Sequence, residues 1–549
     1  MFVRHDLRFS LKVIDCQTKH FNMKGLSSAS PVLTCRQALE LETSILQDES
    51  AQWAAVQRAG VSVANAIYLD FQELQPLPEK FRALALIGKG HNAADALIVC
   101  AQILADFPRA SVTLLLTAEP ESMKPLAKRA YDNLKGRVHI HLVGEDQDEA
   151  AIHALLSEDS KGNGYAMCID GLLGMSFVPP VRESMRTLLG AINRYEHIGL
   201  RAAVDLPSGK GDISDEMCFQ ADFTYATGIA KKVLFEGIAN CGRVRYMDLG
   251  FFDAEPNHAL HASELVLHQS ILNPLRALRP ASVDKRSFGH IFILGGSAFM
   301  PGALLMAVQA AVRSGVGLVT AFAPQSVAAT LAAQVPEAMW VPWPETSNGT
   351  LSPRAMPLLL DRIEQCTAVL LGPGMGKDRN TEMLVQKVIQ LVEQPVILDA
   401  DALGIRAIEL ATKRKSSMGP VILTPHMGEF MHIAKLDQPD YSNETLMDFC
   451  QRYEVMTVLK STHTRLCDGE KVWYNVCGGP VLSRGGSGDL LAGLIGGMVA
   501  KDNPSIQASI ARGIVLHGEA AQHLARAHGQ TAVHTTQLLD YMADVLRST

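Results

Sequence analysis

The feature that most constrains this chain is an alternation of short apolar runs with segments of helical periodicity, and this alternation occurs twice. Apolar runs without polar alternation are typical of strands that are buried on both faces of a sheet. Because helix-like segments separate the runs, consecutive strands can lie parallel in one sheet. The sequence therefore predicts an α/β protein with two domains, each built on a parallel sheet that helices cover.

Strands and helices are predicted in both halves. The strands of the first half span residues 83–88, 111–116, 138–143, 166–170 and 200–205. Those of the second half span residues 291–295, 318–323, 368–371, 396–399, 421–424 and 456–460. Helices are predicted over residues 33–69, 93–106, 301–314 and 490–500.

A change of composition separates the halves. Residues 255–285 contain Pro256, Pro274 and Pro280, and a charged group follows at 284–286. Such a stretch is typical of a connection between domains. We therefore predict four parts, which are an extension over 1–32, a first domain over 33–255, a linker leading into the second domain over 256–285, and a second domain over 286–549.

Composition excludes several classes of protein. With 47% hydrophobic and 19% charged residues, the 549-residue chain can bury large cores and is not expected to be disordered. A formal net charge of −7 argues against a nucleic-acid partner, and no apolar run is long enough to span a membrane. Ten scattered cysteines without C-x-x-C spacing predict buried thiols. Together with the lack of a signal-peptide pattern, they favour a cytoplasmic location.

Unusual residues of the second half follow its strands, where ligands of parallel sheets bind. A Gly-Gly-Ser turn at 295–297 leads to Pro301 and Ala303 at a helix start, and a glycine-rich turn lies at 371–376. Glycines in such a turn allow positive φ and a close approach of backbone to a ligand. His426 follows a later strand. A histidine alone would more often be structural, but this series of strand ends favours a ligand-binding role.

The strongest single signal is the segment 485–489, Gly-Gly-Ser-Gly-Asp, which precedes an apolar helix. Backbone N–H groups at such a helix start can hold a phosphate, and Asp489 is placed to take a proton from a hydroxyl. The alternative is that Asp489 only caps the helix, which would not require a glycine run. Upstream, Lys460, Thr462 and Thr464 form a candidate cradle for a nucleotide phosphate.

The order of these segments resembles that in the ADP-dependent NAD(P)H-hydrate dehydratases, whose fold is ribokinase-like. The resemblance rests on six segments within 280–500, which read GHIFILGGSAFMPGA, LGPGMG, ILDADAL, LTPHMGEF, VLKSTHT and GGSGDLLAG. The first half is similar to the Rossmann-like partner epimerase of the bifunctional NAD(P)H-hydrate repair enzymes. That similarity rests on the segments AMCIDGLLG, DLPSG and ADFTYATGIAK.

The resemblance implies a dehydratase that converts (6S)-NAD(P)H hydrate to NAD(P)H with ADP and Mg²⁺, releasing AMP and phosphate. Asp489 would be its catalytic base. The residues implied to hold the hydrated nicotinamide nucleotide are Ala303, Gly374, Gly376, His426 and Asp489. Those implied to hold ADP are Lys460, Ser461, Thr462, His463, Thr464, Gly486 and Gly488. Small nucleotides would be the partners, and a homo-oligomer is expected.

For the first half, the resemblance implies an epimerase that interconverts the R and S forms of NAD(P)H hydrate. Asp205 and Lys231 would transfer the proton at C6. The residues implied to bind the hydrate are His91, Asn92, Asp95, Gly174 and Asp205. A potassium ion would lie at Asn92, Asp170 and Ser208.

The phosphate loop of the first half departs from the family pattern. Residues 90–96 read GHNAADA where the family has GNNGGDG. An alanine forced to positive φ costs on the order of 1 kcal/mol, and methyl groups at Ala93, Ala94 and Ala96 would crowd the ligand. We therefore expect a weak or inactive epimerase. The alternative is that the segment adopts helical angles and still binds.

Departures in the second half concern nucleotide affinity rather than the reacting groups. Met300 stands where an aromatic residue is usual, Ser461 and Thr462 replace Gly-Ala, and Gly479 replaces Asn. Two other functions remain open. A ribokinase-like vitamin or sugar kinase would use ATP with the same glycine-flanked base, whereas a nucleotide sensor would bind without catalysis. The intact Asp489 disfavours a sensor in the second half, whereas this alternative stays open for the first half.

Overall fold

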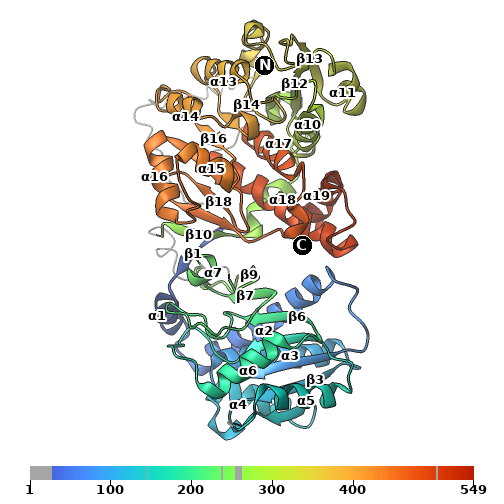
Figure 1. Ribbon diagram of the computed structural model, residues 1–549, viewed down its shortest axis with the longest axis vertical. Coiled ribbons are helices and arrows are strands. Elements are labelled where there is room, and N and C mark those ends of the chain that lie inside the picture. Colours follow the sequence, from blue (N-terminus) through green and yellow to red (C-terminus); the bar gives the residue numbers. More distant parts are fainter. Residues whose placement is uncertain (1–27, 145, 237–238, 254–261, 502–504, 549) are drawn as a thin grey trace, which may run out of the picture.

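Two α/β bodies lie one above the other along the long axis of the molecule (Figure 1). The computed structural model describes residues 28–144, 146–236, 239–253, 262–501 and 505–548. Most of the predicted extension, residues 1–27, and the first part of the predicted linker, 256–261, lie outside the described residues. We call the lower body the N-terminal domain and the upper body the C-terminal domain. In the described chain, no helix combines the length and the apolar character that crossing a bilayer requires.

The N-terminal domain is built on a seven-stranded parallel sheet in the order β4-β3-β2-β5-β6-β7-β9. Its strands are β2 (Arg82–Ile87), β3 (Ser111–Leu116), β4 (His139–Leu142), β5 (Tyr165–Gly171), β6 (Ile198–Val204), β7 (Phe223–Thr227) and β9 (Arg243–Met247). Its helices are α1 (Cys35–Ile45), α2 (Glu49–Phe71), α3 (His91–Asp106), α4 (Pro125–Asp132), α5 (Glu149–Ser160), α6 (Glu183–Arg194) and α7 (Val233–Glu236).

Two separate cores explain the unbroken apolar strands of this domain. Ala83, Ala85 and Ile87 of β2 face α2, α3 and α4, whereas Leu84 and Leu86 face α5 and α6. Because both faces of the sheet are covered, every side chain along the strand must be apolar. The predicted helix over 33–69 is in fact two helices, since Asp48 caps a new helix at Glu49.

The C-terminal domain contains most of a twelve-stranded sheet in the order β13-β12-β11-β14-β15-β16-β17-β18-β19-β10-β1-β8. Its strands are β10 (Glu264–Leu267), β11 (His290–Leu294), β12 (Leu318–Pro324), β13 (Met339–Trp343), β14 (Ala368–Leu371), β15 (Val396–Leu398), β16 (Val421–Leu423), β17 (Val455–Leu459), β18 (Thr464–Cys467) and β19 (Val472–Asn475).

Helices cover both faces of this sheet as well. Core residues from α10, α17, α18 and α19 lie on one face, and those from α13, α14, α15 and α16 on the other. The helices are α9 (Asn273–Arg276), α10 (Pro301–Arg313), α11 (Ala328–Gln334), α12 (Pro357–Leu360), α13 (Arg379–Leu391), α14 (Ile405–Ala411), α15 (Met427–Ala434), α16 (Asn443–Tyr453), α17 (Ser487–Ala500), α18 (Ile506–His528) and α19 (Leu538–Arg547). The predicted α/β fold class, with mostly parallel sheets, is confirmed.

The large sheet also joins the two domains. Strand β1 (Ala29–Leu33) pairs antiparallel with β10 on one side and parallel with β8 (Ala230–Lys231) on the other. Strand β10 in turn pairs with β19. The sequence placed 29–32 in an extension and 264–267 in a linker, and neither segment was expected to be a strand. Lys231 of the N-terminal domain therefore lies on the edge strand of the sheet of the C-terminal domain.

Candidate active site

Helix α17 begins at the Gly-Gly-Ser-Gly-Asp segment 485–489, the strongest signal of the sequence, and packs against the large sheet. Gly486 precedes the helix with φ of 89°, and a Cβ at this position would lie 2.4 Å from the Met306 sulfur. The buried apolar residues that follow fix the direction of the helix in the core. Its N-terminal N–H groups therefore stay in place at a polar edge, as an anion site requires.

Asp489 lies in the first turn of α17, and the capping alternative for this residue is wrong. The residue before the helix is Gly486, and no side chain makes a capping hydrogen bond there. Burial, followed by repulsion from the Asp399 carboxylate, raises the pKa of Asp489 to about 7, although Lys460 acts in the opposite direction. A carboxylate with that pKa is suited to accept a proton near neutral pH.

Lys460 brings a positive charge to the same point. Its Nζ atom lies 2.9 Å from Asp399 Oδ1, which also accepts a 2.7 Å hydrogen bond from Thr424 Oγ1. Burial alone would lower the pKa of Lys460, but the ion pair with Asp399 raises it above its ordinary value. A Cβ on Gly488 would lie 3.2 Å from Lys460 Nζ. The ammonium group is therefore adjacent to the start of α17.

Of the residues predicted to hold the nicotinamide nucleotide, Gly374 and Ala303 are neighbours, whereas His426 lines a cavity with Lys460. Gly374 has φ of +66°, and a Cβ there would lie 2.3 Å from Met300 O and 3.1 Å from the Ala303 methyl group. The N–H of Gly376 donates a 2.9 Å hydrogen bond to Asp401 Oδ2. The backbone thus folds tightly onto the start of α10, where a side chain at position 374 would not fit.

His426 combines a structural role with an exposed one. Its Nδ1 atom accepts a 3.2 Å hydrogen bond from the Glu429 N–H and caps α15. Its side chain remains 61% exposed, and its backbone pairs with that of Lys460. The cap fixes the ring orientation, and Nε2 lies 3.4 Å from Glu429 Oε1.

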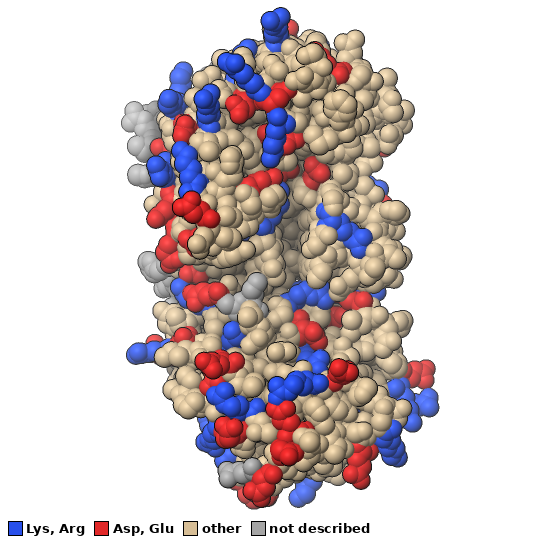
Figure 2. Space-filling model, in the orientation of Figure 1, with Lys and Arg blue, Asp and Glu red and all other residues tan. Residues whose placement is uncertain are grey.

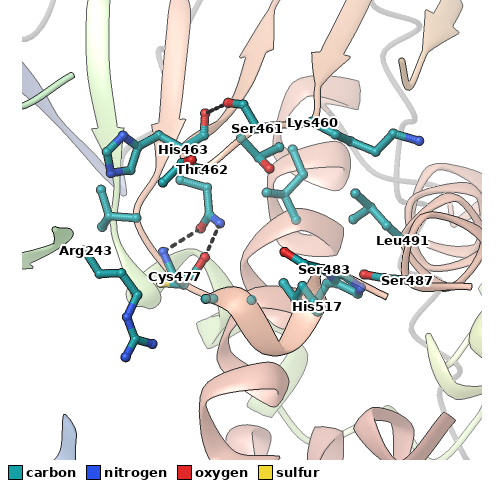
Figure 3. A pocket seen from close by; sticks show the side chains of 18 of the residues that line it. Arg243, Lys460, Ser461, Thr462, His463, Cys477, Ser483, Ser487, Leu491 and His517 are labelled. Carbon is teal, nitrogen blue, oxygen red and sulfur yellow. Dashed lines mark hydrogen bonds between the residues drawn. The ribbon is translucent and has the colours of Figure 1, made fainter. Parts of the chain in front are cut away.

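A cavity of about 440 Å³ unites the predicted ADP-binding segment with the start of α17 (Figure 3). Lys460–Thr464 and Gly488 line it, whereas Gly486 does not and acts at the helix start instead. Sequence reasoning had noted Gly479 but missed other parts of this wall, among them residues 475–478, His517 and Arg243. The Cys-Gly-Gly run at 477–479 was the only available signal for the loop 475–479.

In the N-terminal domain, Asp205 and Lys231 form a buried ion pair. Lys231 Nζ lies 2.5 Å from Asp205 Oδ1, which also accepts hydrogen bonds from the N–H and the hydroxyl of Thr227. Asp205 has φ of 64°, a strained angle for a residue other than glycine. Burial would lower the pKa of Lys231, but Asp205 raises it above its ordinary value.

Next to this pair lies the set of residues predicted to bind potassium. Asp170 accepts hydrogen bonds from the Ser208 hydroxyl and N–H, at 2.6 and 2.7 Å. Burial raises the pKa of Asp170 to about 6. Asn92 donates to Leu173 O at 2.7 Å, and within the described chain its buried Oδ1 atom has no hydrogen-bond donor. An added Cβ on Gly174 would lie 3.2 Å from the Asn92 Cβ atom.

The physical reason given for a weak epimerase is wrong. Residues 91–96 form the first turns of α3, and Ala93, Ala94 and Ala96 are absent from the described non-glycine residues with positive φ. All three methyl groups are fully buried in the protein, and none lines the adjacent cavity. They therefore neither strain the backbone nor crowd a ligand.

That adjacent cavity, of about 130 Å³, is lined by His91, Asp95 and Thr227. Burial, together with Asp205 and Glu42, raises the pKa of Asp95 well above its ordinary value. Glu42 of α1 also lines the cavity, and burial raises its pKa to about 7. The sequence gave no signal for Glu42, since a single glutamate in an amphipathic helix is usually solvated.

Comparisons with known proteins agree with this arrangement. Residues 291–544 match a family model described as NAD(P)H-hydrate dehydratase, and residues 54–233 match one described as YjeF-related protein N-terminus. A dehydratase structure from Bacillus subtilis, co-crystallised with ATP and Mg²⁺, is 28% identical, covers 49% of this chain and 92% of its own, and has a TM-score of 0.41. The two matched stretches fall in the C-terminal and the N-terminal domain, respectively.

Full-length relatives share the same combination. The bifunctional NAD(P)H-hydrate repair enzyme Nnr of Moorella thermoacetica is 30% identical over 512 residues, which cover 90% of this chain and 92% of the relative. That of Gloeobacter violaceus is 30% identical and covers 92% and 96%. The chain belongs to the family of bifunctional NAD(P)H-hydrate repair enzymes.

Proposed function

We propose that the C-terminal site dehydrates (6S)-NAD(P)H hydrate by means of ADP, giving NAD(P)H, AMP and phosphate. Hydroxide is a poor leaving group, and phosphorylation of the C6 hydroxyl converts it into a good one. The ring nitrogen then helps to expel phosphate, and loss of a C5 proton restores the dihydropyridine. The observation that carries this proposal is Asp489, with a pKa of about 7, in the first turn of α17 beside Lys460.

Each part of the site has a role in this reaction. Asp489 accepts the proton of the C6 hydroxyl as that oxygen attacks the β-phosphate of ADP. The N–H groups of Gly486–Gly488 and the ammonium group of Lys460 stabilise the charge that moves onto the phosphate oxygens. The hydrated nicotinamide nucleotide lies toward Ala303, Gly374, Gly376 and His426, and ADP occupies the cavity beside Lys460–Thr464.

Mg²⁺ fits this site as an ion carried by the nucleotide. The described residues contain no cluster of three or more His, Cys, Asp or Glu side chains that could enclose a metal. Mg²⁺ keeps several waters and binds substrate phosphates with few protein ligands, so such a cluster is not required. Asp401, in the turn after β15, is an acidic neighbour of Asp489 and accepts a hydrogen bond from the Gly376 N–H. The ion would neutralise charge on the diphosphate.

For the N-terminal site we propose the inversion of NAD(P)H hydrate at C6, with Asp205 and Lys231 holding and moving the proton. His91, Asn92, Asp95 and Gly174 would border the hydrate. A potassium ion fits beside Asn92, because the Asn92 Oδ1 atom is buried without a donor in the described chain. Asp170 and Ser208 would supply the other oxygen ligands, and the cation would favour the ionised form of Asp170.

One experiment separates this function from that of a vitamin or sugar kinase. Purified protein is incubated with hydrated NADH and either ADP or ATP, and the return of NADH is followed by its near-ultraviolet absorbance. We expect NADH to form together with AMP and phosphate. No NADH with either nucleotide, together with phosphorylation of a vitamin or sugar by ATP, would establish the kinase function instead.

The setting of the protein follows from the same proposal. A metabolite repair enzyme would act in the cytoplasm, where its substrates are made, and buried cysteines fit a reducing compartment. We also propose a homo-oligomer. Light scattering of the purified chain measures its mass directly, and a monomer at micromolar concentration would contradict this part.

A further inference from the structure

A strand of the N-terminal domain forms one wall of the nucleotide cavity in the C-terminal domain. Arg243, Val244 and Arg245 of β9 line it together with Lys460–Thr464 and Gly488 (Figure 3). On the face drawn in Figure 2, the molecule is hollowed between β18 and α18, and basic side chains lie near the hollow. The cavity is therefore incomplete in either domain alone.

Arg243 lies beside Gly479 of the C-terminal domain. A Cβ on Gly479 would lie 2.5 Å from Arg243 Nη1, so that the guanidinium group occupies the space beside this glycine. The N-terminal domain thus supplies a charged group beside Gly479, which has no side chain of its own.

The guanidinium group is fixed before any ligand binds. Nη1 donates hydrogen bonds of 3.0 and 2.8 Å to the two carboxylate oxygens of Glu73 in α2, and the group lies 4.1 Å from the centre of the Phe223 ring. Within the described residues these bonds use Nη1 alone, and 17% of the side chain is exposed. Nε and Nη2 remain available to a ligand, and little side-chain entropy is lost on binding.

The charges of the interface around Arg243 are paired. Asp70 pairs with Arg245 and with Arg526 of α18, and Glu73 pairs with Arg243. Glu519 of α18, which accepts a 2.8 Å hydrogen bond from Cys477 Sγ, adds a third carboxylate, so three carboxylates face three guanidinium groups. Arg245 also donates to Val476 O at 3.2 Å, which ties β9 to the loop after β19.

A second contact orders the nucleotide-binding segment itself. Phe235 of α7 packs edge-to-face on His463, with ring centres 5.3 Å apart, and stacks on Tyr474 at 4.2 Å. His463 lies inside the 460–464 segment, and its backbone carbonyl accepts a 2.7 Å hydrogen bond from the Ser461 hydroxyl. The N-terminal domain thus packs against the nucleotide-binding segment through Phe235.

The position of Arg243 indicates which part of the nucleotide it meets. Lys460 and Gly488 mark the phosphate end, and Figure 3 shows Arg243 on the opposite side of the pocket from Lys460 and Ser487. The apolar side chain of Leu482 lies beside Gly478, in the loop that Arg243 contacts, and an apolar surface suits a base rather than phosphates. Arginine stacks on aromatic faces and donates hydrogen bonds in one plane.

We propose that Arg243 binds the adenosine end of the ADP held by the C-terminal domain, so that the two domains share one nucleotide site. This inference rests on the proposed function, because it takes ADP as the occupant of the cavity. Arg243 acts as a binding residue for the nucleotide and takes no part in proton or phosphoryl transfer.

The test measures ADP affinity by titration calorimetry on the full-length chain. Arg243→Ala is expected to raise the dissociation constant for ADP about tenfold, the size of a lost charged hydrogen bond or cation–π contact, and Arg243→Lys by less. The KM for ADP should rise while kcat at saturating ADP is retained. The affinity for AMP should fall by the same factor, whereas inhibition by inorganic pyrophosphate should not change.

The matched control is Gln530→Ala. Gln530 donates a 2.7 Å hydrogen bond to Glu73 across the same interface but does not line the cavity. The Gln530→Ala substitution should leave the ADP affinity within about twofold of wild type, since interface side chains outside a ligand site contribute little to binding. Equal affinities in Arg243→Ala and wild type, or equal losses in Arg243→Ala and Gln530→Ala, would overturn the inference alone. A wild-type chain that binds no ADP would overturn the proposed function as well.

Discussion

At the scale of single residues, Asp489 shows how burial prepares a carboxylate for proton transfer. A solvated aspartate is too weak a base to take a proton from a hydroxyl, and burial beside Asp399 raises the pKa of Asp489 to about 7. Lys460 keeps the ionised form accessible. The same two neighbours therefore set both the charge that meets the phosphate and the strength of the base.

Replacing Asp489 with Asn keeps the shape of the side chain and removes the base. We expect kcat of the dehydratase to fall by about 10²–10⁴-fold, the range that a positioned base contributes. The far-ultraviolet circular dichroism spectrum and the thermal midpoint should stay close to those of wild type. Turnover within a few-fold of wild type would show that Asp489 is not the base.

The pH dependence of the dehydratase follows from the same pKa. The base must be ionised to act, so kcat/KM should rise with pH through about 7 and then level off. In Lys460→Met the cation that lowers the pKa of Asp489 is missing, so this limb should move to higher pH. A pH profile of the variant that keeps the wild-type midpoint would contradict the coupling, whatever its absolute rate.

At the scale of elements, tight backbone turns place the binding residues. The turn after β14 depends on Gly374, which combines φ of +66° with a Cβ position only 2.3 Å from Met300 O. Gly374→Ala must shift this turn away from α10, where the hydrate would lie. The KM for the hydrate should rise about tenfold or more, since displacement of a binding group by an ångström costs that much or more.

Gly302 offers a matched control for this substitution. It lies in α10 one residue before Ala303, and nothing lies within 4 Å of an added Cβ. Gly302→Ala should leave the KM for the hydrate unchanged and raise helix stability by about 0.5–1 kcal/mol. Steady-state kinetics of the two variants gives their KM values for the hydrate. Equal values would show that Gly374 does not contribute to hydrate binding.

The start of α3 gives an opposite prediction. Ala94 is buried within a regular helix, so Ala94→Gly, which restores a family glycine, should not help the epimerase. It should lower the free energy of unfolding by about 1 kcal/mol, the helix cost of glycine, as measured by urea denaturation. Faster conversion of the R epimer in this variant would support the prediction from the sequence that alanine methyl groups crowd the ligand.

At the scale of the whole molecule, sequence patterns predicted the central strands of both sheets. They missed the short strands that join the two domains. The central strands are continuous apolar runs, and their terminal glycines and aspartates indicated both sites. The joining strands β1, β8 and β10 are short, and Pro31 interrupts the pattern of β1. Arg243 and Glu42 were missed for a related reason, because their roles depend on contacts between segments far apart in the sequence.

Strand β10 tests whether the predicted linker belongs to a core. Leu267 is 2% exposed and packs in the core of the C-terminal domain, and it pairs with Ala29 of β1. Leu278, eleven positions on in the same predicted linker, is 98% exposed. Leu267→Ala should therefore lower the free energy of unfolding by about 2–4 kcal/mol, whereas Leu278→Ala should change it by less than about 0.5 kcal/mol. Urea denaturation of the two variants measures this difference. Equal stabilities would mean that β10 is a simple connection and that the two domains share no sheet.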